Sequence, residues 1–388
     1  MRFASASSEE RRLPAAFEAA AAAVQDGLGG ERADLVLAFA SPHHLAELPG
    51  LIGLVAERFA PRAFLGCTAA GVIGGWRELE MRPGLALLAA SLPDVELRTF
   101  RLDGDGLPDL DRGPGAWHRA LDVPPDPVPQ LLLVCDPASF DPNDLLLGLD
   151  FAYPVSVKLG GLASAGRQNL LLRDREVVDS GVVGLALSGN VVLDPLVAQG
   201  CRPIGEPYTV TACRHNLLLE LDGRPPVTLL QELHDALSPR EQELFHEALH
   251  IGIATSSLGG PREFLVRNVV GADSQEGILA VASLLRPGQT VQFHVRDAAA
   301  AIEDLEQHLL RYRAAERSTL PAGAVLFSCT GRGMGLYGQP DRESQAFREH
   351  LGETPLAGFF CGGEIGPVGE TTHLHGYTGA FGILRPAR

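Results

Sequence analysis

The sequence predicts a mixed α/β protein of two domains, in which a unit of strand, helix, glycine turn and strand occurs three times. Three observations support this fold class. Apolar runs of strand length alternate with stretches of helical period, each such pair leads into a glycine-rich segment, and further strands with hairpin character lie between the units. Because crossover units and hairpins occur together, we expect mixed parallel and antiparallel sheets covered by helices.

The three units share one order of elements and nearly one spacing. Each contains a strand, a helix and a glycine turn, at 34–40, 45–59 and 66–74 in the first unit, 131–136, 143–151 and 160–166 in the second, and 324–330, 344–351 and 358–366 in the third. A unit of about 30 residues suits a parallel crossover connection. We therefore predict an internal duplication.

The length of 388 residues exceeds that of one ordinary domain. Turn-forming residues at 221–226 predict a boundary between a strand and a helix. We accordingly expect an N-terminal helical extension over 1–30, a first domain over 31–222 and a second over 223–388. Within the first domain, the segment 103–130 is rich in Pro, Gly and Asp and is predicted to be a surface loop.

Composition excludes several classes of partner. The net charge of −16 disfavours nucleic acid and anionic membrane surfaces. The single lysine, Lys158, stands outside the Gly-Lys-Ser/Thr pattern of a phosphate-binding loop. No apolar run approaches the ~20 residues that span a bilayer, and the six cysteines are scattered, so we expect a cytoplasmic protein with reduced thiols.

One motif matches a metal site. His246-Glu247-Ala248-Leu249-His250 is the H-E-x-x-H pattern, which binds zinc when it lies on one helix. Ser238 and Glu241 predict the capping box of such a helix. A third ligand is not evident, and the same polar residues suit a solvated helix face. We predict no metal site, with a zinc hydrolase using His246 and His250 as an alternative.

The third glycine turn carries charges that the first two lack. Arg332 and Glu364 stand at the ends of apolar strands, where close packing would favour small neutral groups. The N–H groups of a turn such as Gly362-Gly363 can bind an anion. These features predict a ligand site at the third turn.

Two further residue pairs lie near this turn. Cys329 and Cys361 occupy matching places at a strand end and in the turn, so a thiol hydrolase is another alternative, although no base stands beside them in the sequence. On a strand, His373 and His375 would share a face and could contact a ligand or a haem iron.

Several segments resemble the FIST family. Those similar to the end of the FIST N-terminal domain are 181–189, 199–205 and 210–211, and those similar to the FIST C-terminal domain are 293–297, 327–333, 358–367 and 375–378. Their order along the chain is that of the family. The resemblance extends over residues 30–380 and corresponds to the two predicted domains.

The resemblance implies a sensory module that binds a small molecule, such as an amino acid or a related metabolite. FIST domains occur with histidine kinases and cyclic-dinucleotide enzymes, so a separate signalling protein of this kind is the implied partner. One branch binds haem and senses nitric oxide, which keeps a haem sensor as an alternative. We expect a stand-alone sensor without catalytic residues. The predicted ligand-binding residues are Arg332, Gly362, Gly363, Glu364, His375 and Tyr377, with Arg202 and Arg296 as outer candidates.

Overall fold

The computed structural model describes residues 1–139, 141–255 and 264–388. It contains two compact units, unit 1 (Met1–Ala198 with Leu305–Arg388) and unit 2 (Gln199–Asp304). Helices make up 28% of the chain and strands 40%, so the predicted mixed α/β class is confirmed. The spatial units do not follow the sequence boundary at 221–226, because that turn lies inside unit 2.

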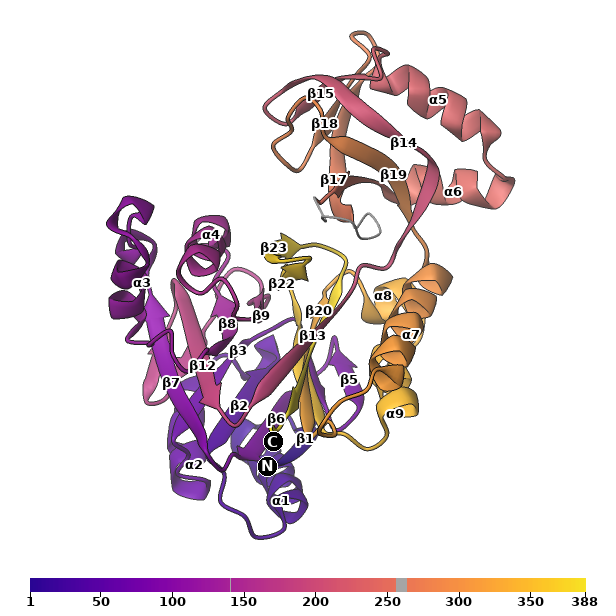
Figure 1. Ribbon diagram of the computed structural model, residues 1–388. Helices are drawn as coiled ribbons and strands as arrows, with labels where there is room; N and C mark the ends of the chain where they lie inside the picture. Colours follow the sequence, from indigo (N-terminus) through magenta and orange to yellow (C-terminus); the bar gives the residue numbers. More distant parts are fainter. Residues whose placement is uncertain (140, 256–263) are drawn as a thin grey trace. The chain divides into compact units, whose positions relative to one another are not determined.

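Three repeats with nearly the same order of elements make up unit 1, apart from residues 298–304 of the third repeat, which belong to unit 2 (Figure 1). The first contains β1 (Arg2–Ser8), α1 (Leu13–Leu28), β2 (Leu35–Ala40), α2 (Leu51–Arg58), β3 (Ala63–Thr68), β4 (Gly71–Gly74), β5 (Arg77–Glu80) and β6 (Leu85–Ser91). The second contains β7 (Val95–Leu102), α3 (Pro114–Leu121), β8 (Gln130–Cys135), α4 (Pro142–Ala152), β9 (Lys158–Leu162), β10 (Leu171–Arg173), β11 (Glu176–Val178) and β12 (Val182–Gly189). The third contains β13 (Val192–Ala198), α7 (Ala298–Ala314), β20 (Gly323–Cys329), α8 (Gly333–Tyr337), α9 (Arg342–Leu351), β21 (Leu356–Cys361), β22 (Glu364–Val368), β23 (Thr371–His375) and β24 (Gly379–Arg385). The predicted duplication is thus present, and unit 2 interrupts the third repeat after β13.

Each repeat builds most of one six-stranded sheet, but its hairpin joins the sheet of another repeat. The strand orders are β1-β6-β2-β3-β10-β11, β7-β12-β8-β9-β22-β23 and β13-β24-β20-β21-β4-β5 in the first, second and third sheets. The hairpin of the first repeat therefore completes the third sheet, that of the third completes the second, and that of the second completes the first. In every sheet the crossover strands are parallel (β2 with β3, β8 with β9, β20 with β21).

One glycine occupies the same register position in each parallel pair. A Cβ added to Gly66, Gly160 or Gly358 would lie 2.1, 2.0 or 1.8 Å from the carbonyl oxygen of the residue opposite. Only glycine permits so close an approach of two backbones. These residues begin the segments predicted as glycine turns, but they lie inside β3, β9 and β21, and the turns follow them.

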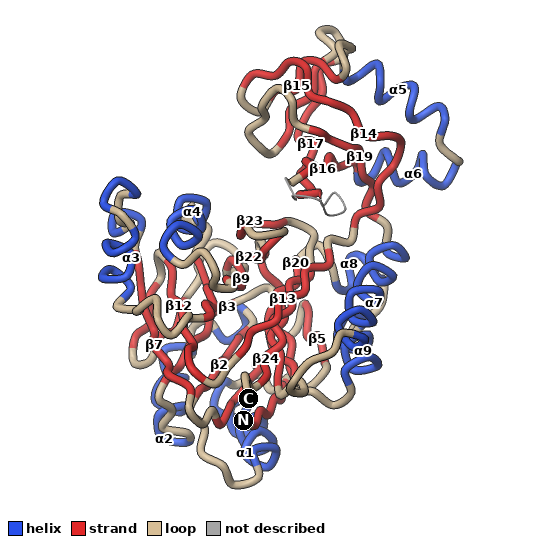
Figure 2. Tube along the Cα trace, viewed as in Figure 1, coloured by secondary structure: helices blue, strands red, loops and turns tan. Residues whose placement is uncertain are grey.

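The inner faces of the three sheets share one apolar core. Phe39, Val134 and Phe359 come from different sheets and belong to this core, and the rings of Phe39 and Phe359 are 5.0 Å apart. Helices cover the outer faces, as Figure 2 shows in blue. α1 and α2 pack on the first sheet and α3 and α4 on the second, while Phe347 of α9 stacks on Phe381 of the third.

The segment 103–130 differs from its prediction as a surface loop. It contains α3, whose Trp117 and Leu121 are buried in the core between the second sheet and its helices. A Cβ at Gly148 of α4 would overlap the Trp117 ring, so the two helices are in close contact. The loop prediction is wrong here because two apolar residues in a Pro- and Gly-rich segment suffice to pack one short helix.

Unit 2 is a closed barrel with strand order β14-β15-β18-β17-β16-β19. Its elements are β14 (Cys201–Arg214), β15 (Leu217–Leu221), α5 (Pro226–Ala236), α6 (Pro239–Ala248), β16 (Leu249–Ala254), β17 (Phe264–Asp273), β18 (Ile278–Val281) and β19 (Thr290–Arg296). The barrel takes strands from both sides of the predicted domain boundary. Ser238 and Glu241 form the predicted capping box at the start of α6. Among the described helices, none has the length and apolar character needed to cross a bilayer.

Candidate functional site

The charged residues predicted from the third glycine turn gather at the carboxyl ends of β20 and β21. β20 ends at Cys329, which is the register partner of Cys361 at the end of β21. Arg332 follows β20, and Glu364 begins β22 after a two-residue bend. We call the buried and half-buried residues around this point the Arg332 cluster: Ser328, Cys329, Arg332, Tyr337, Glu343, Cys361, Glu364, Tyr377 and Thr378.

Arg332 stands at the centre of the cluster with its side chain fully buried. Its Nη1 donates to the carbonyl oxygen of Tyr377 at 3.0 Å, and its Nη2 donates to the hydroxyl of Tyr337 at 2.7 Å. Its Nε donates to the carboxylate of Glu343. Burial is the largest single influence on Arg332 and lowers its pKa, but the charge and hydrogen bond of Glu343, together with Tyr337 and Glu364, raise the pKa above its usual value. Arg332 is therefore a permanent cation inside the protein.

Glu343 is the counter-ion of Arg332. Its Oε2 accepts a hydrogen bond from the Ser328 hydroxyl at 2.6 Å, and its Oε1 accepts one from the Tyr337 hydroxyl at 3.1 Å. The residue lies in the first turn of α9, where a helix favours negative charge. Sequence reasoning missed Glu343, because a glutamate in a first helical turn is usually an exposed residue.

Glu364 is a second fully buried carboxyl group. Its Oε2 accepts from the Thr378 backbone N–H at 3.0 Å, and its Oε1 accepts from the Cys361 thiol at 3.3 Å. Burial raises the pKa of Glu364 to about 8, against its usual value of 4.5, although Arg332 and these hydrogen bonds oppose the rise. Glu364 is thus largely protonated at neutral pH.

The two cysteines of the cluster are poor nucleophiles. Burial raises the pKa of Cys329 to about 12 and that of Cys361 well above its usual value. The Cys361 thiol also donates to the carbonyl oxygen of Ser328 at 3.2 Å. Because a nucleophilic cysteine must be a thiolate, this geometry disfavours the alternative of a thiol hydrolase.

Two carboxylates from the first repeat reach the same region through the exchanged hairpin. Glu78 of β5 accepts at Oε1 from the backbone N–H and the hydroxyl of Ser344, both at 2.8 Å. Its Oε2 is buried and has no hydrogen-bond partner among the residues that the structure describes, and burial together with the charge of Glu343 raises the pKa of Glu78 to about 8. Glu80 accepts from the Met334 N–H at 2.8 Å. Sequence reasoning missed both, because no local pattern shows which sheet a hairpin joins.

The remaining predicted residues of the third repeat lie beside the cluster. His375 is the register partner of Glu364, and its Nε2 is 3.0 Å from the carbonyl oxygen of Gly366. Tyr377 has a φ of 61°, a left-handed conformation that is unfavourable for tyrosine. Gly362 and Gly363 form the bend between β21 and β22. A haem iron bound through Nε2 of His375 would have to displace the contact with the carbonyl.

The two outer candidates lie in unit 2. Arg202 of β14 forms an ion pair with Glu241 of α6, with Nη1 and Oε1 at 2.9 Å. Arg296 ends β19 and is the register partner of Cys201. Both arginines therefore belong to the barrel, whereas the Arg332 cluster belongs to unit 1.

The H-E-x-x-H segment does not form the helical pair of ligands that was considered. α6 ends at Ala248, and His250 lies in β16, where its Nδ1 is 2.8 Å from the Ala248 carbonyl oxygen. His246 instead approaches His234 of α5, with the two Nε2 atoms 3.0 Å apart. Among the described residues no group of three or more potential ligands could hold a metal ion, and the side chain of Glu247 lies outside them. The motif fails as a helical site because the chain changes from helix to strand within it.

Comparisons with known proteins find relatives that are similar over nearly the whole chain. An uncharacterized protein of Mycobacterium tuberculosis is 40% identical over 376 residues, covering 95% of this chain and 96% of that protein. An uncharacterized protein of Mycobacterium bovis is 38% identical over 379 residues, covering 95% of each chain. An F-box/LRR-repeat protein of Arabidopsis thaliana is 31% identical over 101 residues, which cover 25% of this chain and 19% of that protein.

Two family models match the sequence. The FIST N domain matches residues 34–224 and includes the first two repeats, apart from β1 and α1, together with the first two barrel strands. The FIST C domain matches residues 230–367 and includes the rest of the barrel and most of the third repeat. The chain therefore belongs to the FIST family.

Proposed function

We propose that this protein is a FIST sensor that binds a small molecule, such as an amino acid or a related metabolite, at the Arg332 cluster. FIST domains are regarded as modules of sensing and signal transduction. The signal would pass to a separate partner protein, such as a histidine kinase or a cyclic-dinucleotide enzyme. The observation that carries the proposal is a group of buried ionisable residues at the carboxyl ends of parallel strands.

Position supports this choice of site. Ligands of α/β proteins bind beyond the carboxyl ends of parallel strands, where the chain turns from strand to helix. β20 and β21 are such a pair, and the Arg332 cluster follows their ends. In the first two repeats, the residues after β3 and β9 are Ala69-Ala70 and Ala163-Ser164, which carry no charge, whereas the buried Asp136 follows β8.

The balance of charges at the Arg332 cluster also supports this choice of site. Around the single cation Arg332 stand three buried carboxyl groups, those of Glu78, Glu343 and Glu364. Burying unpaired carboxylates costs free energy, and groups with strongly shifted pKa values concentrate at functional sites. A ligand that brings a cation or takes up a proton here would change the charge of the cluster. Such a change can be transmitted, because α8, α9 and the exchanged hairpin all bond to these residues.

A binding screen tests the proposal. Thermal-shift measurements with the standard amino acids and related metabolites should find a ligand that raises the melting temperature. The conservative variants Glu364→Gln and Tyr337→Phe should weaken its binding at least tenfold, since the first removes an ionisable carboxyl group of the cluster and the second a hydroxyl that bonds to Arg332. Glu232→Gln, which alters an exposed residue of the barrel, is the matched control and should bind normally. If both cluster variants bind as tightly as the control, the site is misplaced.

A further inference from the structure

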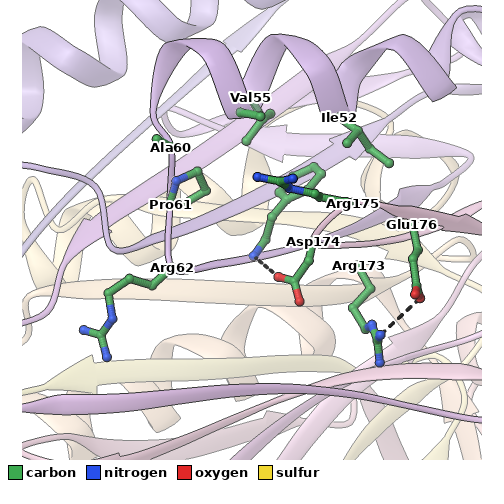
Figure 3. Close-up of a pocket in the computed structure, with 11 residues that line it drawn as sticks. Ile52, Val55, Ala60, Pro61, Arg62, Arg173, Asp174, Arg175 and Glu176 are labelled. Atoms are coloured by element: carbon green, nitrogen blue, oxygen red, sulfur yellow. Dashed lines mark hydrogen bonds and ion pairs between the residues drawn. The ribbon is translucent and has the colours of Figure 1, made fainter.

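A pocket on the first sheet, formed by residues of the first and second repeats, lies far along the chain from the residues of the Arg332 cluster. It has a volume of about 430 Å³ and opens between α2, the segment that leads into β3, and the turn of the β10–β11 hairpin (Figure 3). This volume falls in the usual range of small-ligand sites, about 300–1,000 Å³. Its lining residues are Ile52, Val55, Ala56, Ala60, Pro61, Arg62, Phe64, Arg173, Asp174, Arg175 and Glu176.

The pocket combines an apolar wall with a basic rim. Ile52 and Val55 of α2 form the wall, and Arg62, Arg173 and Arg175 form the rim. The lining holds three arginines against two acidic residues, so it carries a net charge of 3 − 2 = +1 in a chain whose net charge is −16. Arginine is the side chain best suited to bind carboxylate or phosphate, because its planar donors match two oxygens at once.

The acidic residues of the lining offset two of the three arginine charges, and both are engaged within the protein. Asp174 is engaged in the hairpin turn, where its Oδ1 accepts from the Phe64 N–H at 3.0 Å and its Oδ2 accepts from the Thr99 hydroxyl. Glu176 pairs with Arg173, with Oε2 and Nη2 at 3.1 Å. Arg175 forms no hydrogen bond or ion pair with any residue that the structure describes.

Arg173 and Arg62 also have guanidinium N–H groups that could donate hydrogen bonds to a ligand. The Nε of Arg173 is buried and has no hydrogen-bond partner in the described part of the chain. The Nη2 of Arg62 donates to the Val95 carbonyl oxygen at 3.0 Å, and its Nη1 is 3.6 Å from Asp34. The rim thus presents more positive charge than the pocket itself balances.

The third repeat shows what fills the equivalent place. Counted from the register glycines Gly66 and Gly358, Arg62 corresponds to Thr354 and Ala56 to Arg348. The hairpin registers make Trp76 the counterpart of Arg175. There the Trp76 Nε1 donates to the Thr354 carbonyl oxygen at 3.0 Å, and the Arg348 guanidinium lies 4.5 Å above the indole ring. An aromatic side chain therefore lies between the helix and the hairpin in the third sheet. We call this place, between the helix before the register glycine and the exchanged hairpin, the junction.

The second repeat fills the junction by another contact. Asp150 of α4 stands where Ala56 and Arg348 stand in the other repeats, ten residues before the register glycine Gly160. Its carboxylate accepts from the Thr372 N–H and hydroxyl, both at 2.7 Å, and pairs with Lys158 at 2.8 Å. Hairpin and helix are thus bonded directly in the second and third sheets, whereas in the first sheet a pocket lies between them.

We infer that this pocket binds a small organic anion with a flat apolar body. The body would pack against Ile52 and Val55, in the place that the Trp76 indole takes in the third sheet. The carboxylate or phosphate group would pair with Arg175 and with the donors of Arg62 and Arg173. This site is distinct from the one proposed at the Arg332 cluster, and neither inference requires the other.

Benzoate and phenyl phosphate are suitable probes, because each carries a flat ring and one anionic group. Ligand-observed NMR titration of the full chain should give saturable binding of at least one of them in the millimolar range or tighter. Benzamide, which has the ring without the charge, should bind at least tenfold more weakly. Inorganic phosphate should also bind more weakly, because it lacks the apolar body.

Two variants test the location. Arg175→Trp combined with Ala56→Arg rebuilds the filled junction of the third sheet and should abolish probe binding while the protein stays folded. Arg175→Ala should weaken binding at least tenfold, and Arg167→Ala, an exposed arginine outside the lining, should leave it unchanged. Absence of saturable binding to the unaltered protein, or equal binding by the filled variant, overturns the inference. Neither result affects the test with Glu364→Gln at the Arg332 cluster, so each proposal can be contradicted without contradicting the other.

Discussion

Replacement of Gly358 by alanine should separate two strands at the middle of unit 1. The added Cβ would lie 1.8 Å from the carbonyl oxygen of Leu326, whereas an ordinary contact needs at least 3.4 Å. β21 must therefore move away from β20 by about 1.6 Å, beyond the tolerance of a hydrogen-bonded ladder. Overpacking of this kind costs about 1–3 kcal/mol, and each ladder hydrogen bond lost adds about 1 kcal/mol. We expect a loss of about 3 kcal/mol or more in the free energy of unfolding.

Thermal unfolding followed by circular dichroism measures this loss. For a unit of this size the expected fall in melting temperature is roughly 6 °C or more. Gly53→Ala is the matched control, because Gly53 lies inside α2 with no atom within 4 Å of the added Cβ. It should stabilise the protein by about 0.5–1 kcal/mol. If Gly358→Ala melts within 2 °C of the unaltered protein, the close approach of β20 and β21 is not as described.

Three other predictions concern buried charges. Burial raises the pKa of Glu78 to about 8 from 4.5, so the folded state binds more protons than the unfolded state between these values and stability falls as pH rises through this window. Glu78→Gln should therefore gain stability relative to the unaltered protein between pH 5 and pH 9 in urea unfolding, and a constant difference would contradict the burial of this group. Lys158→Met should cost about 3 kcal/mol, because it leaves Asp150 without its buried cation, and an unchanged urea midpoint would show that the pair contributes nothing. The side chain of Lys158 is 2% exposed, so an amine-reactive ester should label the native chain once, at its amino terminus, and the denatured chain twice, as counted by mass spectrometry.

Local sequence patterns were sufficient for most elements of the crossover units, although the helix predicted at 45–59 is shorter in the structure and corresponds to α2, Leu51–Arg58. The strands and helices predicted at 131–136, 143–151 and 344–351 correspond to β8, α4 and α9 within two residues at each end. Each has an apolar period or run that depends only on neighbouring residues. The Arg332 cluster was found in part for the same reason, since Arg332 and Glu364 are charges placed visibly among glycines.

Long-range pairing was not predictable in this way. Glu78 reaches Ser344 because the β4–β5 hairpin pairs with β21, some 280 residues later in the chain. No residue within the hairpin indicates which strand the hairpin will pair with. The barrel was missed for a related reason, because β14 and β19 pair across two helices and other strands. Side-chain alternation identifies the buried face of a strand but not the strand beside it.

The cyclic exchange of hairpins has a consequence for how such a chain could arise. Each repeat donates one hairpin and receives one, so the pairing closes on itself after three steps. Three separate copies of a one-repeat chain would satisfy the same pairing as a ring with threefold symmetry. A gene fusion that joined such copies end to end would preserve every strand contact while freeing each copy to diverge. The insertion of a barrel into one repeat, the buried charges of the Arg332 cluster and the arginine-lined pocket on the first sheet are the divergence that fusion permits.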